Sequence, residues 1–264
     1  IHIYAPALAG AEVRRVHLSI DADFFERLQQ AFVETWPRPR VILTSFPHNP
    51  TTAVVDLGFF ERLTEFALEH EIMLIHDHAY ADILFDDYRP PSLLQVPAAK
   101  EIGVEIYSMS KGHSMPGWRV GFVVGNREMI GALAKLKSYL DYGTFQPIQI
   151  ASIIALNECD DYSAEVSAIY KRRRDALVDG LRRAGWDVPR PRGTMFVWAE
   201  IPERFAHLGS LDFAIEMLDQ ARVAVSPGIG FGPSGDRHVR FALVENEHRT
   251  QQAVRSIRRF LEEA

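Results

Sequence analysis

Short apolar runs that alternate with helix-like segments constrain the fold of this chain more than any other feature. The apolar runs lie at residues 40–46, 72–80, 104–109 and 119–125. Segments 56–71 and 127–140 carry apolar residues at helical spacing, and Asp56 suits the N-cap of the first. Continuously apolar strands that alternate with helices are typical of a mostly parallel sheet with both faces covered. The first part of the chain is therefore predicted to be an α/β domain.

The pattern changes after about residue 157. Residues 160–185 read as one long helix with basic residues on its polar face. Strand-like segments follow at 195–201, 222–227 and 238–244, and helix-like segments at 210–221 and 247–263. We therefore expect two domains: residues 1–159, part of a large domain whose N-terminal portion is absent, and residues 160–264, a smaller α+β domain.

The composition excludes several classes of protein. The formal net charge is -6 and the pI is about 5.9, so there is no bulk electrostatic case for binding nucleic acid or an anionic membrane. No apolar run approaches the roughly 20 residues needed to span a bilayer. The single cysteine, Cys159, excludes an internal disulfide and fits a reducing compartment, so we expect a cytoplasmic protein.

The first residues read as the middle of a domain. The chain starts with Ile1, no signal-peptide pattern precedes the fold, and a strand-like segment follows at 12–18. We expect that a beginning is missing.

Polar residues follow the apolar runs where each predicted strand ends. Asn49, Asp77 and Lys111 all lie just beyond such a run. In open α/β sheets the ligand crevice lies at the carboxyl ends of the strands. We therefore expect these three residues to be neighbours although they are far apart in the sequence.

Lys111 is the residue with the most informative surroundings. Ser108 and Ser110 precede it, Gly112 follows it, and Arg119 comes eight residues later. Hydroxyls, turn amides and a guanidinium together suit a phosphate dianion. An amine beside a phosphate site is the arrangement expected for a Schiff base with pyridoxal phosphate. The competing interpretation, from position alone, is an ordinary surface lysine.

Three further residues fit the same cofactor. Asp77 could keep a pyridine nitrogen protonated, and Tyr80 and Asn49 could donate hydrogen bonds to a phenolic oxygen. Each is weak evidence alone, because Asn and Asp are common in turns and caps for local reasons.

Arg240 lies on an apolar strand, where a charge is costly without a partner, and this favours a carboxylate ligand over a structural ion pair.

Four segments carry a resemblance to a known family: "SFPHNPTT", "HDHAYADILFD", "YSMSKGHSMPGWRVGFVVGN" and "HVRFALVEN". In this order and spacing they resemble the class I/II aminotransferases, which are fold-type I pyridoxal phosphate enzymes. The segments "KSYLDYGTFQPIQIA", "YKRRRDALV" and "SPGIGFG" are most similar to the glutamate–pyruvate (alanine) aminotransferase branch. The resemblance covers essentially the whole chain. It implies a large domain with a mostly parallel sheet and a smaller α+β C-terminal domain.

The resemblance also implies roles for the cofactor-binding residues. Lys111 is expected to be catalytic, forming the Schiff base and moving the substrate's alpha proton. Asp77, also catalytic, is expected to pair with the pyridine nitrogen. Asn49 and Tyr80 are expected to bind the phenolic oxygen.

The phosphate and the substrate have residues of their own. The resemblance implies that Ser108, Ser110 and Arg119 hold the phosphate. Arg240, with Asn49, is expected to bind the substrate alpha-carboxylate. The expected reaction moves an amino group between an amino acid, alanine or glutamate, and a 2-oxo acid, pyruvate or 2-oxoglutarate. The resemblance further implies a homodimer.

The chain departs from the family pattern in two ways. Thr52 stands where the family has glycine after Asn-Pro-Thr, and the family's segment before the position of Ile1 is missing. That segment carries, in the family, a helix start that binds phosphate, a ring that stacks on the cofactor and a tyrosine offered across the dimer. Its absence puts the activity of this chain alone in doubt, but not the family.

Other interpretations stay open or fail on particular residues. A β-eliminating lyase, another amino-acid specificity and a non-catalytic ligand sensor share the same motifs. The Ser-x-x-Lys pattern of residues 108–111 lacks the companion elements of penicillin-binding enzymes. His76 and His78 share one strand face, but no third ligand is evident, so no metal site is predicted. The glycine-rich residues 228–235 open no convincing helix and do not indicate a dinucleotide site.

Overall fold

A four-stranded sheet forms the centre of the first half of the chain in the computed structural model, which describes residues 1–20 and 23–263. Its strand order is β1-β2-β3-β4, with bounds β1 Val41–Ser45, β2 Met73–Asp77, β3 Gly103–Ser108 and β4 Gly121–Gly125. The first three strands are parallel and β4 is antiparallel to β3. The predicted mostly parallel sheet is therefore confirmed.

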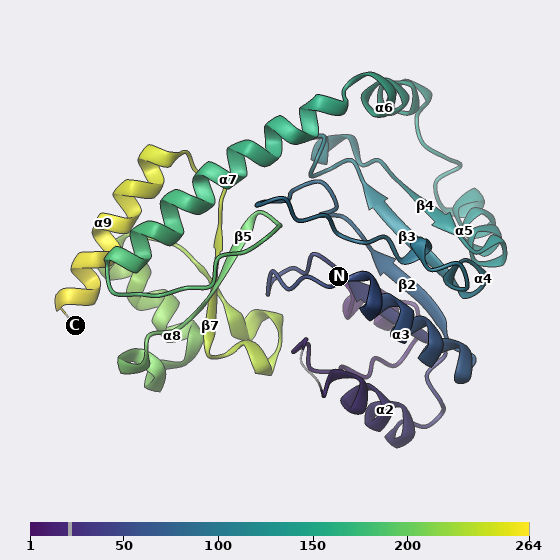
Figure 1. Ribbon diagram of the computed structural model, residues 1–264, viewed down its shortest axis with the longest axis horizontal. Helices are drawn as coiled ribbons and strands as arrows, with labels where there is room; N and C mark the ends of the chain where they lie inside the picture. Colours follow the sequence, from purple (N-terminus) through teal and green to yellow (C-terminus); the bar gives the residue numbers. More distant parts are fainter. Residues whose placement is uncertain (21–22, 264) are drawn as a thin grey trace.

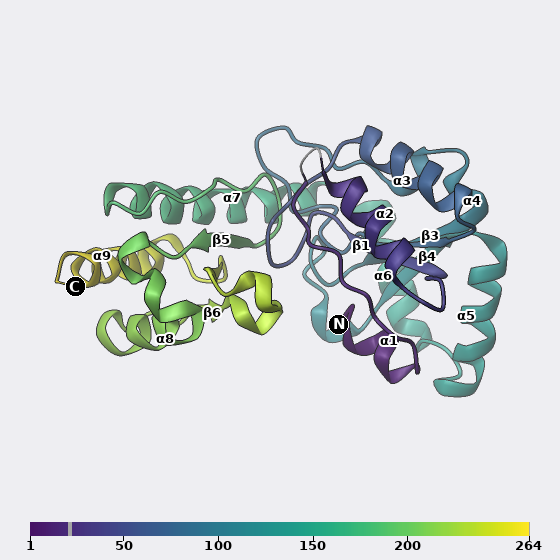
Figure 2. The same ribbon diagram turned by 90° about the horizontal axis from the view of Figure 1, so that it is seen from below.

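Helices cover this sheet with a strongly aromatic layer. α3 (Leu57–Glu69) begins at the predicted N-cap, where the Asp56 carboxylate accepts the Phe59 N–H at 2.9 Å. It buries Phe60 and Leu63 in a cluster that also takes in residues of α2 (Phe24–Glu34) and α4 (Ala99–Ile102). α3 and α4 lie on one face of the sheet, and α5 (Arg127–Leu140) lies on the other (Figure 2).

A long helix connects the two halves of the molecule. α7 (Asp160–Arg183) runs from the region of α6 (Gln146–Glu158) to the second sheet (Figure 1). Arg174 in its middle is buried and donates to the Asp86 carboxylate, to the Asp175 carboxylate at 2.9 Å and to the Pro191 carbonyl at 2.8 Å. This network ties α7 to the loop that follows β2.

The second sheet is antiparallel and has its own core. Its order is β5-β7-β6, with bounds β5 Phe196–Glu200, β6 Ser226–Pro227 and β7 His238–Ala242. α7, α8 (Gly209–Glu216) and α9 (Glu247–Glu263) surround a cluster that includes Val178, Phe213 and Phe260. This cluster is separate from the one under α3, which supports the proposed division into residues 1–159 and 160–264.

Two expected strands differ from the structure. Residues 12–18 pair with no strand among those described, and the expected strand 222–227 is reduced to β6.

The remaining helical segments are short: α1 Tyr4–Leu8, 3-10 turns at Leu93–Gln95, Pro116–Trp118, Glu203–Leu208, Gly228–Phe231 and Pro233–Gly235, and a π-helical turn at Met217–Ala221. Across residues 1–20 and 23–263, no helix combines the length and apolar composition that crossing a bilayer requires.

Candidate active site

Asp77 ends β2 and carries the carboxylate that the sequence singled out. Its Oδ2 accepts a hydrogen bond from His2 Nε2 at 2.7 Å, and its Oδ1 accepts the Ala79 N–H at 3.1 Å. Burial acts to raise the pKa of Asp77, but the hydrogen bond and charge of His2 outweigh it, so the pKa is lowered. Asp77 is therefore an ionised carboxylate at neutral pH.

Asn49 joins the two halves of the molecule at the site. Its Oδ1 accepts a hydrogen bond from Arg240 Nη1 at 2.7 Å, although the two residues are 191 positions apart. Its Nδ2 lies 3.5 Å from the Tyr80 hydroxyl, a long hydrogen bond. Burial raises the pKa of Tyr80 to about 12, against the lowering effect of the Arg240 charge, so the phenol stays protonated at neutral pH.

Arg240 projects from β7 between two aromatic rings. Its guanidinium carbon lies 4.2 Å from the Phe196 ring centre and 4.6 Å from that of Phe231. Nη2 donates to Ser226 Oγ at 3.3 Å, while the buried Nε has no hydrogen-bond partner among the residues that the structure describes. Burial lowers the pKa of Arg240. A half-buried guanidinium with an unpartnered Nε suits an anionic ligand.

Lys111 lies in the turn between β3 and β4. Its Nζ is 5.8 Å from the centre of the Tyr80 ring, and it makes no hydrogen bond or ion pair within the described part of the chain. Gly112 comes next, where an added Cβ would lie 2.4 Å from the Asp82 carboxylate, so only glycine fits there without a shift. The Asp82 carboxylate in turn accepts the Tyr107 hydroxyl proton. These contacts fix the turn that carries the lysine.

The residues predicted to bind phosphate are only partly brought together. The Ser108 hydroxyl accepts the Ser110 N–H at 3.2 Å, so the two serines share one turn. Arg119 adopts a left-handed backbone conformation with φ of 52° and donates to the Pro116 carbonyl at 2.9 Å. Its side chain is exposed and is bonded to its own turn instead of to the serines.

Two residues near Asp77 were not predicted from the sequence. One is the His2 partner, which no local sequence signal could reveal because 75 residues separate the pair. The other is Glu105, which lies beside His76 and His78. Its register partner in β2 is His76, so aligning the two strands, and noting a carboxylate within an apolar run, could have identified it.

The chain is similar in sequence to known proteins along almost its whole length. The family model described as aminotransferase class I and II matches residues 2–257. The chain is 50% identical over 258 residues to glutamate-pyruvate aminotransferase AlaC of Escherichia coli (strain K12), covering 98% of this chain and 63% of that protein. It is 51% identical over 264 residues to putative aminotransferase AatC of Rhizobium meliloti (strain 1021), covering 100% of this chain and 65% of that protein.

A solved structure has the same arrangement. The substrate-bound BacF structure from Bacillus subtilis superposes with a TM-score of 0.90 at 35% identity, covering 98% of this chain and 65% of that one. The chain thus spans 63% to 65% of the length of these three relatives.

Proposed function

The chain belongs to the class I and II aminotransferases, and on that basis we propose that the protein moves an amino group between an amino acid and a 2-oxo acid, with pyridoxal phosphate as cofactor. The proposed pairs are alanine with pyruvate and glutamate with 2-oxoglutarate, which the name of the Escherichia coli relative supports. The observation that carries the proposal is the pairing of Arg240 with Asn49 at 2.7 Å. It holds the Arg240 guanidinium at Asn49, which, like Asp77 and Lys111, lies at the end of a strand of the first sheet.

The residues present fit the proposed cofactor. Asp77 supplies an ionised carboxylate for a ring nitrogen, and Tyr80 a protonated phenol for a ring oxygen. Lys111 supplies an amine with no competing partner within the described part of the chain. When bound, pyridoxal phosphate supplies a carbonyl that takes up amino groups and a ring that accepts electrons from the substrate alpha carbon.

The phosphate end fits less completely. Ser108 and Ser110 present hydroxyls and amides on one turn, which suits phosphate oxygens. Arg119 would have to exchange its bond to the Pro116 carbonyl for one to the phosphate. Because that side chain is exposed and makes one neutral hydrogen bond, a charge-assisted bond to phosphate would be the stronger of the two.

Each residue then has a definite task. Lys111 Nζ would take the proton from the substrate alpha carbon as general base and, as general acid, would deliver it to the cofactor. Arg240 orients the substrate by its carboxylate, with Nη1 and Nη2 exchanging their bonds to Asn49 and Ser226 for bonds to that carboxylate. Asp77 holds the proton on the ring nitrogen by its negative charge, and His2 keeps that carboxylate ionised.

We further propose a cytoplasmic homodimer. The family resemblance and the single cysteine, Cys159, support this, as does the exposed apolar surface of α5 and α6. Light scattering of the full-length protein tests the assembly. A monomer at every concentration would contradict it.

The test of the reaction is amino transfer from alanine to 2-oxoglutarate by the full-length protein. Lys111→Ala should lose at least ~10²-fold in kcat, the low end of what a positioned acid–base group contributes. Lys100→Ala, which removes an exposed lysine of α4, is the matched control and should leave kcat unchanged. Wild-type protein that transfers no amino group between these substrates would contradict the proposed specificity.

The role of Arg240 has a separate readout. Arg240→Lys keeps the charge but loses the paired donors, so KM for alanine should rise by about 10–150-fold, the range of one or two charge-assisted hydrogen bonds. An unchanged KM would show that the carboxylate binds elsewhere.

A further inference from the structure

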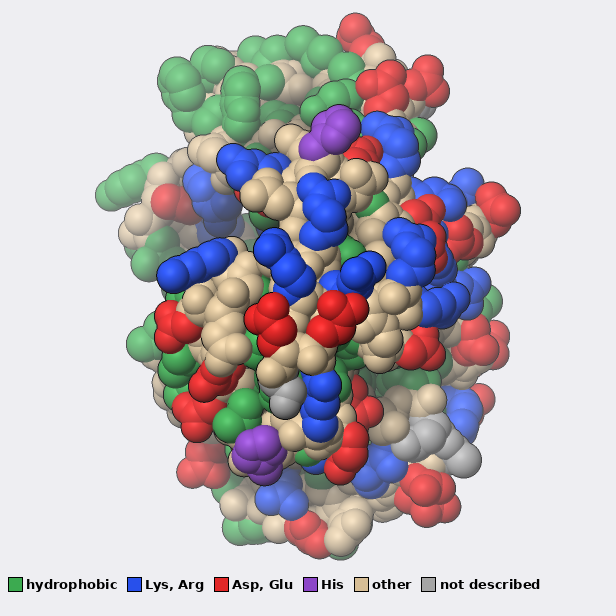
Figure 3. Space-filling model, turned by 90° about the vertical axis from the view of Figure 1, so that its left-hand side faces the viewer, with side chains coloured by type: hydrophobic (Ala, Val, Ile, Leu, Met, Phe, Trp, Pro, Cys, Tyr) green, Lys and Arg blue, Asp and Glu red, His purple; other side chains and the backbone are tan. Residues whose placement is uncertain are grey.

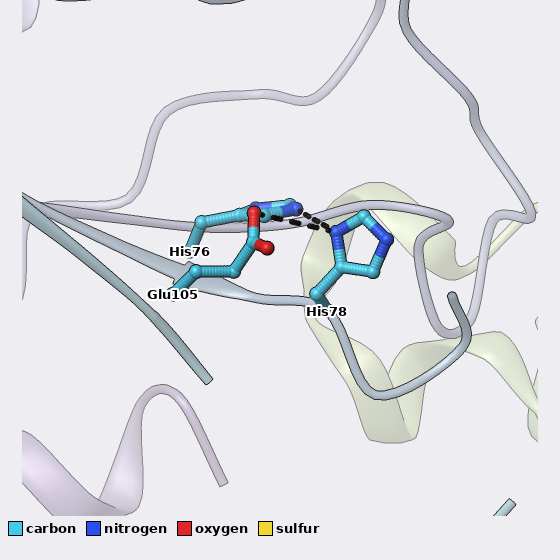
Figure 4. A group of neighbouring side chains, drawn as sticks. All are labelled: His76, His78 and Glu105. Carbon is cyan, nitrogen blue, oxygen red and sulfur yellow. Dashed lines mark hydrogen bonds and ion pairs between the residues drawn. The ribbon is translucent and has the colours of Figure 1, made fainter. Parts of the chain in front are cut away.

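Three side chains of the kinds that bind metal ions meet on the core side of β2 (Figure 4). His76 Nε2 lies 3.0 Å from His78 Nδ1, and His78 Nδ1 lies 3.6 Å from Glu105 Oε2. One ligand atom from each of the three lies within 4.8 Å of the others. The two imidazoles and the carboxylate therefore face a common point.

Strand geometry explains why these residues converge. His76 and His78 are two positions apart, so they project to the face opposite that of Asp77. Glu105 is the register partner of His76 in the neighbouring strand β3, which brings its carboxylate alongside the histidine pair. The His76 ring packs at 4.8 Å against that of Phe60, which confirms that this is the core face. The cluster is thus distinct from the polar side of the sheet that carries the candidate active site.

Two of the three side chains, those of His76 and Glu105, are held in place by residues outside the cluster. Thr44 Oγ1 lies 3.2 Å from His76 Nδ1, the ring nitrogen that faces away from the cluster. The Glu105 carboxylate accepts the Ser92 hydroxyl proton and the Leu93 N–H, both at 2.9 Å. Partners of this kind fix the tautomer of a histidine and the orientation of a carboxylate before a metal binds.

The burial of the two histidines also suits metal binding. His76 is 0% exposed and His78 is 6% exposed, so bulk water competes weakly for the same atoms.

We propose that His76, His78 and Glu105 form a binding site for a divalent transition-metal ion of the Zn²⁺ class. With metal–ligand bonds of about 2.0–2.2 Å, adjacent ligands of a tetrahedral ion lie roughly 3.3 Å apart, between the two distances of 3.0 and 3.6 Å here. Two imidazoles and one carboxylate suit Zn²⁺, Co²⁺ or Ni²⁺ better than Mg²⁺ or Ca²⁺, which prefer oxygen. Three protein ligands leave the fourth position for water.

Metal binding would join two strands at one point. The histidines come from the end of β2 and Glu105 from β3, while Thr44, which contacts His76, comes from β1. The metal ion would take the place of the contacts that now join the three side chains directly. The competing explanation is a core cluster whose side chains bond only to one another and bind no metal.

The experiment is a metal count on the full-length holoenzyme, purified from cultures supplemented with Zn²⁺ and dialysed against a weak chelator. Loading during folding matters because the ligands are buried. The proteins compared are wild type, His78→Leu, Thr44→Val and the control His248→Ala, which removes an exposed imidazole. Competition with a coloured chelator then gives the relative affinities.

The expected wild-type result is one retained Zn²⁺ per chain, with a melting temperature that rises with metal. Thr44→Val, which removes only a residue that orients His76, should weaken binding by about 10–100-fold. His78→Leu, which removes a ligand, should weaken it further, and His248→Ala should leave it unchanged.

Two results would overturn the proposal. Wild-type protein that retains no metal would show that the hydrogen-bonded cluster excludes it. Equal metal content in wild type and Thr44→Val, with equal affinity, would place the ion elsewhere on the protein, even if His78→Leu failed to fold.

Discussion

The helices that pack on the C-terminal sheet differ from α5 and α6 in how much of their apolar surface is buried. α9 buries Ile257, Phe260 and Leu261 against the sheet and the neighbouring helices. α5 buries no residue and α6 only Ser152. Figure 3 shows charged side chains of both signs over the C-terminal side of the molecule and hydrophobic side chains gathered at its upper end, where Figure 1 places α6.

The difference shows that an apolar helix face does not by itself create a core. The α5–α6 segment exposes Tyr139, Tyr142, Phe145 and Ile153, with Phe145 71% exposed. A contiguous apolar surface of this kind marks a contact with further protein, and the proposed homodimer offers one. The C-terminal sheet needs no such contact because three helices already cover it.

The largest expected loss in the free energy of unfolding follows from the removal of an aromatic ring from the C-terminal core. Phe213→Ala removes a fully buried side chain that contacts the rings of Phe205 and Trp186, and should lower the free energy of unfolding by about 3–5 kcal/mol. Phe145→Ala removes the same group from the α6 side and should change the free energy of unfolding of the monomer by no more than about 0.5 kcal/mol. Urea unfolding at a protein concentration low enough to give monomer measures both values. Equal losses in the monomer would mean that α6 is covered as well as the C-terminal core.

An intermediate loss in the free energy of unfolding is expected for a substitution in α7, the helix that runs between the two regions. Arg174 is 1% exposed, and Arg174→Met leaves Asp86 and Asp175 without their shared guanidinium. The cost should be about 2–3 kcal/mol, less than for a fully buried pair, because the Asp86 side chain is 42% exposed.

The matched control for Arg174 lies on the same helix. Arg172→Met breaks an exposed ion pair with Glu247 and should cost at most about 1 kcal/mol in the same unfolding measurement. A similar cost for both substitutions would show that the burial of Arg174 adds nothing to the free energy of unfolding.

The sequence predicted the fold well because its signals were local. The fold-type I family, the parallel order of β1 to β3 and the Asp56 cap are confirmed. The family resemblance grouped Asn49 with Arg240 as substrate-binding residues, and the two side chains are hydrogen-bonded to each other, although their roles remain predictions.

The contacts that were not predicted depend on long-range pairing or on the conformation of a single residue. The His2–Asp77 hydrogen bond joins residues 75 positions apart, and Glu105 joins the two histidines only through the register of β2 with β3. The bond from Arg119 to the Pro116 carbonyl depends on a left-handed residue at the end of a short turn. None of these contacts leaves a periodic pattern in the sequence.

The smallest expected effect is a change in how the urea midpoint depends on pH. This change should follow a substitution in α7 but not one at α6. The hydrogen bond from Arg174, aided by Lys171, outweighs burial and lowers the pKa of Asp86 to about 2, from an ordinary value of about 3.9. A carboxyl whose pKa is lowered by folding stabilises the folded state above its unfolded value, and this stabilisation disappears as the pH falls through its folded value. The urea midpoint of the wild type should therefore fall between pH 4 and pH 2. Arg174→Met should flatten that fall, whereas Phe145→Ala should leave it unchanged. An equally steep fall in Arg174→Met would assign the acid sensitivity to other carboxylates and remove α7 from the comparison.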